Sequence, residues 1–497
     1  METNPFRNKV GTNILTEPYV IFGFILTAAL IGFILVLSGV TLAFALLAIP
    51  ILLLFVNKIF VNAAFAMTVL IVIDFTLLGL TRYIPITIGY VLDIYLLLLF
   101  LAYFFNHFYT KVDFKPLKND LVYLSLIWFG YIVMEIANPE AVSTEAWFSS
   151  MRGEALYMIM VIPLVYLIFN KPKYLDLFMY IWGIMTILAF LKGIQQLYLK
   201  PDFWEQKWLD DGAYQTHVLW GKLRIFSFFT DASQFGASQG QSGVLGILLY
   251  FNTKNYKKKI FWLIVGLTGL YSMMISGTRG AIAVPLAGFA LYIILKKNIK
   301  IIIVGGFVLA SVFVFFKFTT IANDNYQINR MRTAFNPKDD ASMNLRLLNQ
   351  RKFAAYLKNR PIGGGVGHAG NRAQKFVPYG YLANIATDSW FVMIWAECGI
   401  VGLFLHLFIL FYILGKSIYI VMFRLKNKEL IAKLGVLLCC MFGIIAASYS
   451  NMYLGQFPTH ILLFTSMAYI FLGVNLEKQL EHDEKEKLLQ NKLLTSQ

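Results

Sequence analysis

Residues 271–290 read YSMMISGTRGAIAVPLAGFA, and they place a single arginine, Arg279, inside a long run of mostly apolar residues. A charged side chain in hydrocarbon is costly. Two interpretations are open: Arg279 is buried and paired inside a helix bundle, or it lies at a turn between two membrane-spanning helices. The choice decides how the rest of the chain is divided into spans.

Composition places the chain among integral membrane proteins. It has 497 residues, of which 58% are hydrophobic and only 14% are charged. Apolar stretches of bilayer-spanning length recur along it, which predicts an all-α, polytopic membrane helix bundle. The net charge of +16 is typical of lysine-rich cytoplasmic loops that contact membrane lipids, and no nucleic acid is expected as a partner. The three cysteines all lie in apolar runs, so no disulfide framework is predicted.

The charges between the apolar runs alternate. A window of about 20 residues gives roughly 12–14 spans, the first of them uncleaved because no small-residue cleavage site follows it. Every second connection is rich in Lys and Arg, and these connections are expected to face the cytoplasm together with both termini. Their basic residues are Lys58, Lys111, Lys115, Lys118, Lys171, Lys173, Lys254, Lys257, Lys258, Lys259, Lys296, Lys297, Lys300, Arg424, Lys426 and Lys428.

This alternation resolves the position of Arg279. One helix through residues 259–296 would be about 57 Å long, nearly twice the hydrocarbon core, and both of its ends are lysine-rich. The segment is therefore predicted to be a hairpin that turns at residues 276–280, where Gly277 and Gly280 permit a tight reversal. Arg279 then lies at the outer membrane boundary. Taken alone, it would be explained as a helix-end arginine that reaches lipid head groups.

Other arginines indicate a ligand. Four regions are predicted: transmembrane helices at 1–318 with an outer loop at 198–235, a large periplasmic loop at 319–385, further transmembrane helices at 386–475, and a cytoplasmic tail at 476–497. Both outer segments contain arginines, among them Arg224, Arg346, Arg351 and Arg360. Outer loops have no topological reason to be basic, so an anionic ligand is expected there. Arginine suits phosphate because its planar fork donates two parallel hydrogen bonds.

Charged residues within the predicted spans also lie toward the outer side. They are Asp74, Asp93, Glu135, Lys192 and Glu397. Their shared depth predicts a polar chamber that opens outward, because charges inside a membrane usually face a bundle interior or a wet cavity. Separate structural ion pairs are the alternative.

Four motifs carry a resemblance to a known family. They are LRIFSFFTDASQFG at 223–236, SGTRGA at 276–281, NLRLLNQRKFAAYLKNRPIGGGVG at 344–367 and TDSWFVMIWAECGIVGLF at 387–404. In order and spacing they resemble the O-antigen ligase and O-antigen polymerase family, over about two fifths of the chain. The resemblance implies a metal-independent glycosyltransferase of the bacterial inner membrane, without a cofactor. Its partners would be a glycan on undecaprenyl diphosphate and an acceptor glycan or lipid, and Arg224, Arg279 and Arg346 would bind the diphosphate.

One position departs from the family. Ligases of this family place a histidine at the start of the span that follows the large outer loop, where this chain has Asp388. A carboxylate can take the proton of an acceptor hydroxyl, so Asp388 is the candidate base, with Glu397 about two to three turns further along the helix. His368 is the nearest alternative, although a lone loop histidine is more often simply solvated. The departure favours polymerisation over ligation, and an inverting mechanism is expected.

Three further patterns have simpler interpretations. Gly365, Gly367 and Gly370 fit G-x-G-x-x-G, but no strand of a βαβ unit precedes them, so no dinucleotide site is predicted. Residues 343–359 form an amphipathic pattern, which predicts either a lid on the outer membrane surface or a helix packed on the bundle. No cluster has metal-ligand spacing. A flippase for lipid-linked sugars, or a cell-wall glycan polymerase of another family, is the alternative function; a flippase would place its charges near the midplane.

Overall fold

The fold is taken from a computed structural model that describes residues 52–84, 88–106, 114–335 and 341–495. The chain divides into two units, Met1–Ala66 and Met67–Gln497. In the first unit, the described part contains the apolar helix Leu52–Val61 and the start of α3 (Ala63–Leu80). The first two predicted spans lie largely outside the described residues.

The second unit is almost wholly helical. After α3, the described helices are α4 (Val91–Asn106), α5 (Asp120–Met134), α6 (Thr144–Met151), α7 (Tyr157–Leu167), α8 (Pro172–Tyr198), α9 (Phe203–Trp208), α10 (Tyr214–His217), α11 (Ala232–Asn252), α12 (Tyr256–Ile275), α13 (Ala283–Leu295), α14 (Ile299–Phe318), α15 (Tyr326–Arg332), α16 (Ala341–Leu357), α17 (Trp390–Tyr419), α18 (Lys428–Ala447), α19 (Thr459–Phe471) and α20 (Gly473–Thr495). The described strands are β1 (Val218–Leu219) and β2 (Lys222–Leu223), which pair antiparallel. The predicted all-α membrane fold is confirmed.

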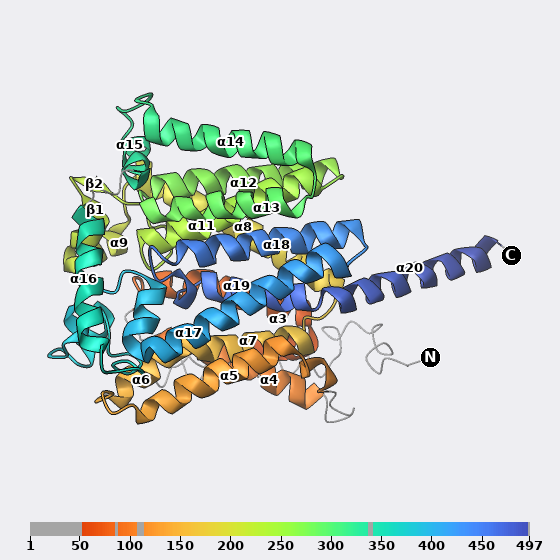
Figure 1. The fold of residues 1–497 in the computed structure, drawn as a ribbon. Helices are drawn as coiled ribbons and strands as arrows, with labels where there is room; N and C mark the ends of the chain where they lie inside the picture. The colour runs from red at the N-terminus through yellow and green to blue at the C-terminus, as the bar shows by residue number, and fades with distance from the viewer. Residues whose placement is uncertain (1–51, 85–87, 107–113, 336–340, 496–497) are drawn as a thin grey trace, which may run out of the picture. The chain divides into compact units, whose positions relative to one another are not determined.

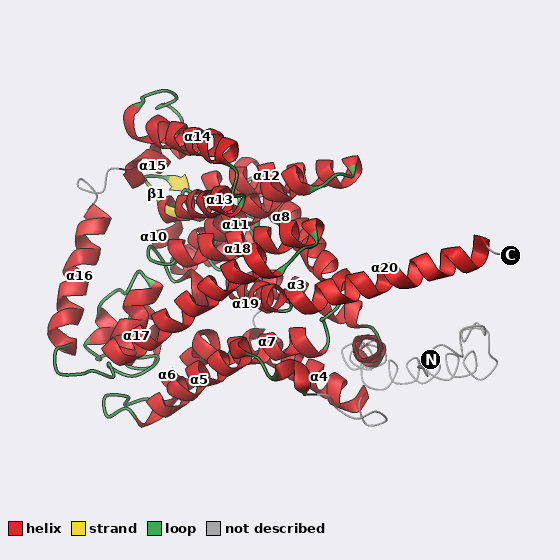
Figure 2. Cartoon of the chain, turned by 45° about the vertical axis from the view of Figure 1, so that its right-hand side comes forward, coloured by secondary structure: helices red, strands yellow, loops and turns green. Residues whose placement is uncertain are grey.

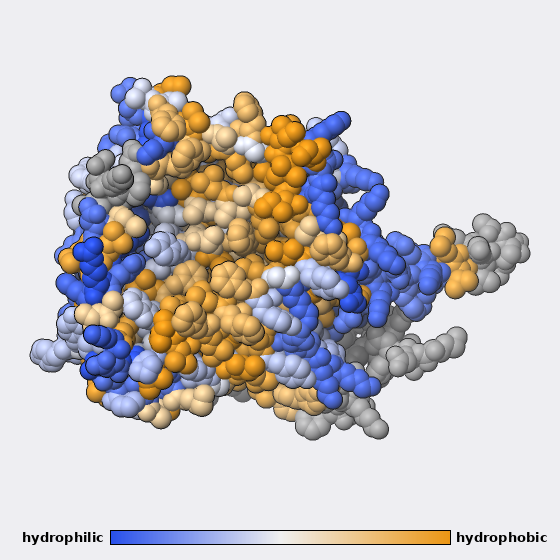
Figure 3. All heavy atoms as spheres, in the orientation of Figure 1, coloured by the Kyte–Doolittle hydropathy of each residue, from blue (hydrophilic) through white to orange (hydrophobic). Residues whose placement is uncertain are grey.

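Eight described helices are long and apolar enough to cross a membrane, or nine if the bent pair α19–α20 is one span. The apolar helices Val91–Phe105 and Arg279–Leu295 are shorter. The surface in Figure 3 has a wide apolar band between two hydrophilic ends, as expected of a bundle whose middle faces lipid. The total of about 12–14 spans stays a prediction, because residues 1–51 are not described.

The predicted hairpin around Arg279 is confirmed. Helix α12 ends at Ile275, a short 3₁₀ turn covers Arg279–Ile282, and α13 begins at Ala283. Gly277 has a φ of +60°, the left-handed conformation that glycine adopts without strain. Figure 1 shows α12 and α13 side by side, with the turn at the end of the bundle where α15, β1 and β2 lie.

Helix α11 is buried over most of its length, although Phe251 near its C-terminal end is exposed, and it packs closely against α12. A Cβ added at Gly246 would meet the backbone nitrogen of Gly266 at 2.2 Å, so the two backbones touch. Buried Gln and Ser residues occupy much of α11, which explains why this 21-residue helix is less apolar than its neighbours.

The glycine loop at 361–367 fits into a break in α17. Gly399 has a φ of +67° inside this helix. The backbone N–H groups of Gly364 and Gly365 donate to the carbonyls of Ala396 and Glu397, each at 2.9 Å. A Cβ at Gly363 would meet the Glu397 carbonyl oxygen at 2.4 Å, so only glycine permits this approach. The loop therefore satisfies carbonyls that the broken helix leaves unpaired.

Helix α16 crosses the end of the bundle at a steep angle to α12, α13 and α14 (Figures 1 and 2). Its C-terminal half packs: Phe353 and Leu357 are buried in a cluster that includes Leu382 and Val392. Leu345 and Leu348 in the other half are 53% and 48% exposed. The packed-helix interpretation of residues 343–359 is therefore right for the C-terminal half, and the N-terminal half leaves an apolar face uncovered.

Candidate active site

The arginines singled out from the sequence meet in one cavity. A space of about 1140 Å³ is lined by residues of the 218–233 segment, the turn at 278–283, α15, the N-terminal part of α16 and the 450–453 turn. Arg224, Arg279 and Arg346 all line it, together with Arg330 of α15. These residues come from four separate segments, so the fold, and not local sequence, assembles the group. We call this cavity the arginine pocket.

Arg224 is fixed by backbone and side-chain contacts on both sides. It follows the β1–β2 hairpin, and its guanidinium donates to Thr278 Oγ1 at 2.8 Å and to the Thr216 carbonyl at 3.2 Å. Thr278 in turn donates to the Ala232 carbonyl at 3.0 Å. The Arg224 Nε–H is buried and has no partner among the described residues. The guanidinium is thus held in one orientation, and its buried Nε–H is left without a hydrogen bond to the described residues.

Arg330 joins the turn of the hairpin to α15. Its Nε–H donates to the Gly277 carbonyl, and its guanidinium lies 5.4 Å from the centre of the Trp220 ring. Arg279 donates from the same turn to Thr333 Oγ1 at 3.5 Å. Arg330 was not predicted from the sequence as a site residue. The basic pair Arg330 and Arg332 in the outer segment was the sequence signal for it.

The pocket concentrates positive charge. Four arginines line it, and none of its lining residues within the described chain is Asp or Glu. Burial lowers the pKa of Arg224, nearby Asp231 counteracts part of that change, and repulsion from Arg279 adds to it. Burial and repulsion from Arg224 and Arg279 lower the pKa of Arg330. Both pKa changes mean that the cationic forms are held at a cost, which an anion in the pocket would relieve.

The pocket also has polar and apolar walls. Tyr453 is fully buried, and its hydroxyl lies 3.0 Å from Ser233 Oγ. The apolar lining residues are Leu219, Ile282, Ala283, Ala334 and Met343. Cations, hydroxyls and apolar groups therefore face one space, which suits an amphiphilic ligand.

Asp388 lies next to the pocket, where it contacts the lining residue Arg346. Its Oδ2 is 3.9 Å from the Nε of Arg346, and its side chain is 43% exposed. Asp388 has a φ of +49°, in the left-handed region, directly before the N-cap of α17. Non-glycine residues in this region store strain and recur at functional sites. The geometry brings the candidate base within one side chain of the arginines.

Glu397 and His368 lie outside the pocket lining. Glu397 is buried beside the break in α17, with its Oε1 3.8 Å from Arg372, and Arg372 also binds Glu154 at 2.9 Å. His368 Nε2 accepts the Ser143 backbone N–H at 3.0 Å, and Nδ1 lies 2.9 Å from the Val366 carbonyl. These contacts occupy both ring nitrogens of His368 and suit a histidine that fixes the glycine loop to α6.

The charged residues of the spans have local partners. Asp93 pairs with Arg152 at 2.5 Å, and Glu135 Oε2 accepts from Asn138 at 2.7 Å. Lys192 pairs with Asp202 and Glu205 at 2.8 and 3.1 Å. Asp74 is buried, and neither of its carboxylate oxygens has a hydrogen-bond partner among the described residues. None of these residues lines the arginine pocket. Separate structural ion pairs describe Asp93 and Lys192, whereas Glu135 bonds a neutral amide and Asp74 has no hydrogen-bond partner among the described residues.

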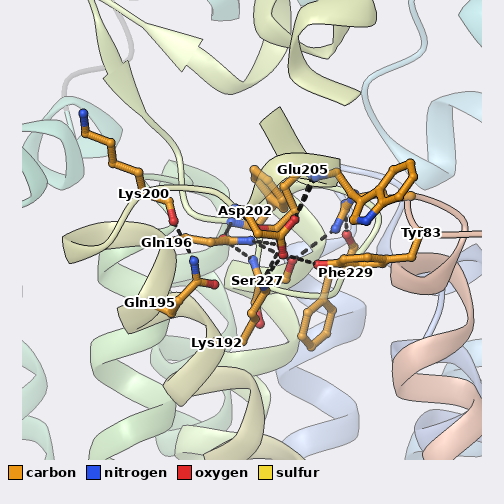
Figure 4. A network of polar contacts seen from close by, with 12 residues as sticks. Tyr83, Lys192, Gln195, Gln196, Lys200, Asp202, Glu205, Ser227 and Phe229 are labelled. Carbon is orange, nitrogen blue, oxygen red and sulfur yellow. Dashed lines mark hydrogen bonds and ion pairs between the residues drawn. The ribbon is translucent and has the colours of Figure 1, made fainter. Parts of the chain in front are cut away.

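A polar network holds the segment that carries Arg224 (Figure 4). Gln196 donates to Glu205 at 2.8 Å and to the Ser227 carbonyl at 3.0 Å, while its Oε1 accepts the Ser227 N–H at 2.7 Å. Asp202 accepts from Lys192 and Tyr83 at 2.8 and 2.6 Å. The network thus ties the end of α3 and the end of α8 to the chain three residues beyond Arg224.

Electrostatics in this network follow from burial and pairing. Partial burial of Asp202 opposes ionisation, but hydrogen bonds from Lys192, Tyr83 and a backbone N–H outweigh it and lower the pKa of Asp202 to about 2. Arg82 donates to the carbonyls of Ser227 and Thr230, each at 3.1 Å. Burial lowers the pKa of Arg82 to about 10, and nearby carboxylates counteract part of that change.

Comparison with known families gives a match to part of the chain. Residues 263–407 match the family model described as O-antigen ligase. The predicted resemblance to the O-antigen ligase and polymerase family is confirmed. The matched segment contains Arg279, Arg330, Arg346 and Asp388, whereas Arg224 precedes it. A search of curated proteins finds no match to this chain. The match supports a function of the O-antigen ligase or polymerase type in an integral membrane protein.

The prediction that no cluster has metal-ligand spacing is wrong for one group of residues in the described part of the chain. His482, Asp483 and Glu486 have ligand atoms within 4.8 Å of one another, and all three are exposed on α20. Helix α20 extends from the end of the bundle opposite to α16 (Figure 1), so this group is remote from the arginine pocket.

Proposed function

We propose that this protein is a glycosyltransferase that takes a glycan from an undecaprenyl diphosphate carrier at the periplasmic face of the bacterial inner membrane, and joins it to an acceptor glycan or lipid. Arg224, Arg279 and Arg346 bind the diphosphate, and Arg330 completes the group. The observation that carries the proposal is the arginine pocket itself: four arginines with no carboxylate among the described lining residues, beside an apolar wall. Such a pocket matches a diphosphate attached to a prenyl chain.

The chemistry follows from this charge. The oxygen of the acceptor hydroxyl attacks the anomeric carbon, and the bond between that carbon and the diphosphate oxygen breaks. Undecaprenyl diphosphate leaves with the bonding electrons, and the arginines stabilise the charge that builds on it. Asp388 takes the hydroxyl proton. Attack from the face opposite the leaving group inverts the configuration, and arginine charge replaces a metal ion.

Polymerisation and ligation differ only in the acceptor. This chain has Asp388 at the position where ligases of the family have a histidine. The difference favours a polymerase. A flippase has less support, since the arginines lie at the end of α12 and α13 and not at their midpoints.

The proposed orientation has a direct test. Tyr379, in the outer segment, is 97% exposed, and Tyr256, at the start of α12, is 75% exposed. All three native cysteines are buried. Tyr379→Cys is expected to react with an impermeant thiol reagent in intact spheroplasts, and Tyr256→Cys only after lysis. The reverse result would place the arginine pocket in the cytoplasm and remove the donor from its reach.

The activity is tested with the purified full-length protein. The protein is incubated with a glycan on undecaprenyl diphosphate alone, so that a second molecule of the same lipid-linked glycan is the acceptor, or together with a lipid acceptor. A chelator is present in both reactions. Extension of lipid-linked chains would identify a polymerase, and transfer to the lipid acceptor a ligase. Release of free carrier without a new glycosidic bond, or inhibition by EDTA that Mg²⁺ reverses, contradicts the proposed mechanism.

A further inference from the structure

A second cavity lies at the other end of α12. It measures about 930 Å³ and is lined by residues of α8, α11, α12, α13 and α18 and by the chain segments that precede α12 and α18. Helix α12 has 20 residues, so the cavity and the arginine pocket are separated by about 30 Å, one hydrocarbon thickness. Figure 1 shows the starts of α12 and α18 at the same end of the bundle, the one from which α20 projects.

The lining is cationic. Five lysines line the cavity against one Asp and one Glu, an excess of three positive charges; the lysines are Lys254, Lys258, Lys296, Lys428 and Lys433. Lys433 binds both acidic residues, Asp176 at 2.6 Å and Glu429 at 2.7 Å. Lys296 donates to Asn252 Oδ1 at 2.8 Å. Lys433 therefore pairs with both acidic residues. Glu429 also attracts Lys254 and Lys258, but the lining as a whole keeps its excess of three positive charges.

Two helices add to the positive potential. Helices α12 and α18 begin at this cavity, capped by the side chains of Asn255 and Asn427, and both caps line it. Helix N-termini carry a partial positive charge and favour anions. Together with the lysines, they define a place for an anionic group and not only a solvated basic loop.

The deeper lining is apolar and aromatic. Met179, Leu249 and Leu295 come from three different helices, and Trp262 and Tyr180 stack at 5.2 Å between ring centres. Lys258 lies 5.9 Å from the centre of the Tyr180 ring. A ligand that fills the cavity therefore needs a phosphate-like head near the lysines and a hydrocarbon portion beside these side chains. Basic cavities between helices at a membrane surface fit phospholipid head groups in this way.

We propose that this cavity binds the phosphate head group and upper acyl chains of an anionic phospholipid from the leaflet opposite the arginine pocket. The lysines and the two helix N-termini hold the phosphate, and the apolar lining takes the chain. A bound lipid would link α8, α12, α13 and α18. The turn that joins α12 to α13 lines the arginine pocket at the other end of these helices. The proposal does not depend on the transferase chemistry.

The test uses the full-length protein after exchange into a neutral detergent, with thermal unfolding followed as lipid is added. Phosphatidylglycerol is expected to bind at least about tenfold more tightly than phosphatidylcholine, and the combined variant Lys254→Gln, Lys258→Gln and Lys428→Gln to lose about 100-fold in affinity for it. Because all three lysines are exposed, folding should not suffer. The matched control is Lys478→Gln, Lys485→Gln and Lys487→Gln on α20, which changes the same charge and should leave binding intact.

Two further probes separate the possible ligands. Inorganic phosphate and glycerol phosphate carry the anion without the acyl chains, so neither should raise the unfolding midpoint as phosphatidylglycerol does. Equal stabilisation by inorganic phosphate would mean a site for a soluble anion and would overturn the lipid assignment. Equal binding of both lipids, or equal losses in the two triple variants, would overturn the site.

Discussion

Replacement of Arg224 by lysine tests whether the pocket recognises phosphate through guanidinium geometry. The change keeps the positive charge, but it removes the planar fork that donates to Thr278 and Thr216 and the buried Nε–H. One ammonium group cannot both keep the Thr278 contact and make two parallel bonds to a diphosphate. The structure therefore predicts the loss of at least one charge-assisted hydrogen bond to the ligand.

The magnitude follows from that loss. A hydrogen bond to a charged group contributes about 1.5–3 kcal/mol, which corresponds to a fall of about 10- to 150-fold in kcat/KM. Because negative charge on the diphosphate increases as the glycosidic bond breaks, kcat should fall more than KM rises. The assay is transfer by the purified protein from a lipid-linked donor, at several donor concentrations, with the thermal unfolding midpoint as a check on folding.

The matched control is Arg360→Lys in the same outer region. Arg360 pairs with Glu140 at 2.8 Å, lies 4.1 Å from the centre of the Tyr356 ring, and does not line the arginine pocket. As a partly exposed ion pair it should affect stability by less than about 1 kcal/mol and leave kcat/KM nearly unchanged. If Arg224→Lys keeps kcat/KM within about threefold of the parent, or if both variants lose equally, recognition of the diphosphate by Arg224 is refuted.

Three other substitutions probe the proposed base, the turn and the supporting network. Asp388→Asn should lower kcat by about 100-fold with little change in donor affinity; normal turnover would move the base elsewhere. Gly280→Ala should destabilise the protein by about 1–3 kcal/mol, because its Cβ would lie 2.2 Å from Ser450 Oγ; adding Ser450→Gly should restore both stability and activity, and failure to do so would disprove this clash. The lowered pKa of Asp202 gives stability that is complete above about pH 4 and lost as the pH falls toward 2; Asp202→Asn should flatten the unfolding midpoint over that range, and an unchanged profile would contradict the role of this carboxylate.

The sequence predicted the hairpin because both features that indicate it can be read directly along the chain. The distance between two lysine-rich connections and the position of Gly277 and Gly280 are both read along the chain, and together they leave one place for the turn. The meeting of Arg224, Arg279 and Arg346 was predictable for a similar reason, since segments at the same end of a helix bundle share a narrow layer. Their residue-level contacts, such as that of Arg224 with Thr278, needed the fold.

The place of Arg330 in the pocket could not be predicted from the sequence. Arg330 and Arg332 lie two residues apart in the same outer segment and carry the same sequence signal. In the structure Arg330 lines the pocket, whereas Arg332 turns away and donates to Thr319 Oγ1 at 3.2 Å. The packing of α15 against its neighbours decides which of its side chains point into the pocket. The sequence of this short helix does not determine that packing by itself. The charged residues within the spans show the same limit, because the position of a residue along its helix can be read from the sequence, whereas the rotation of the helix about its axis cannot.

The depth of the arginine pocket is itself an argument for a lipid-linked donor. A soluble sugar nucleotide would be bound most economically in an extramembrane domain, where cations cost nothing to place. Here Arg279 lies on a turn of seven residues between two apolar helices, and Ile282 and Ala283 of the same turn and helix line the pocket beside it. A prenyl chain stays in hydrocarbon, so its diphosphate can travel no further than the head-group layer. Arg279, held between the ends of α12 and α13, would meet the proposed diphosphate at that layer, and the open half of α16, with Leu345 and Leu348 uncovered, lies across the same end. The position that makes Arg279 costly in an ordinary helix is thus the one that a membrane-bound phosphate donor requires.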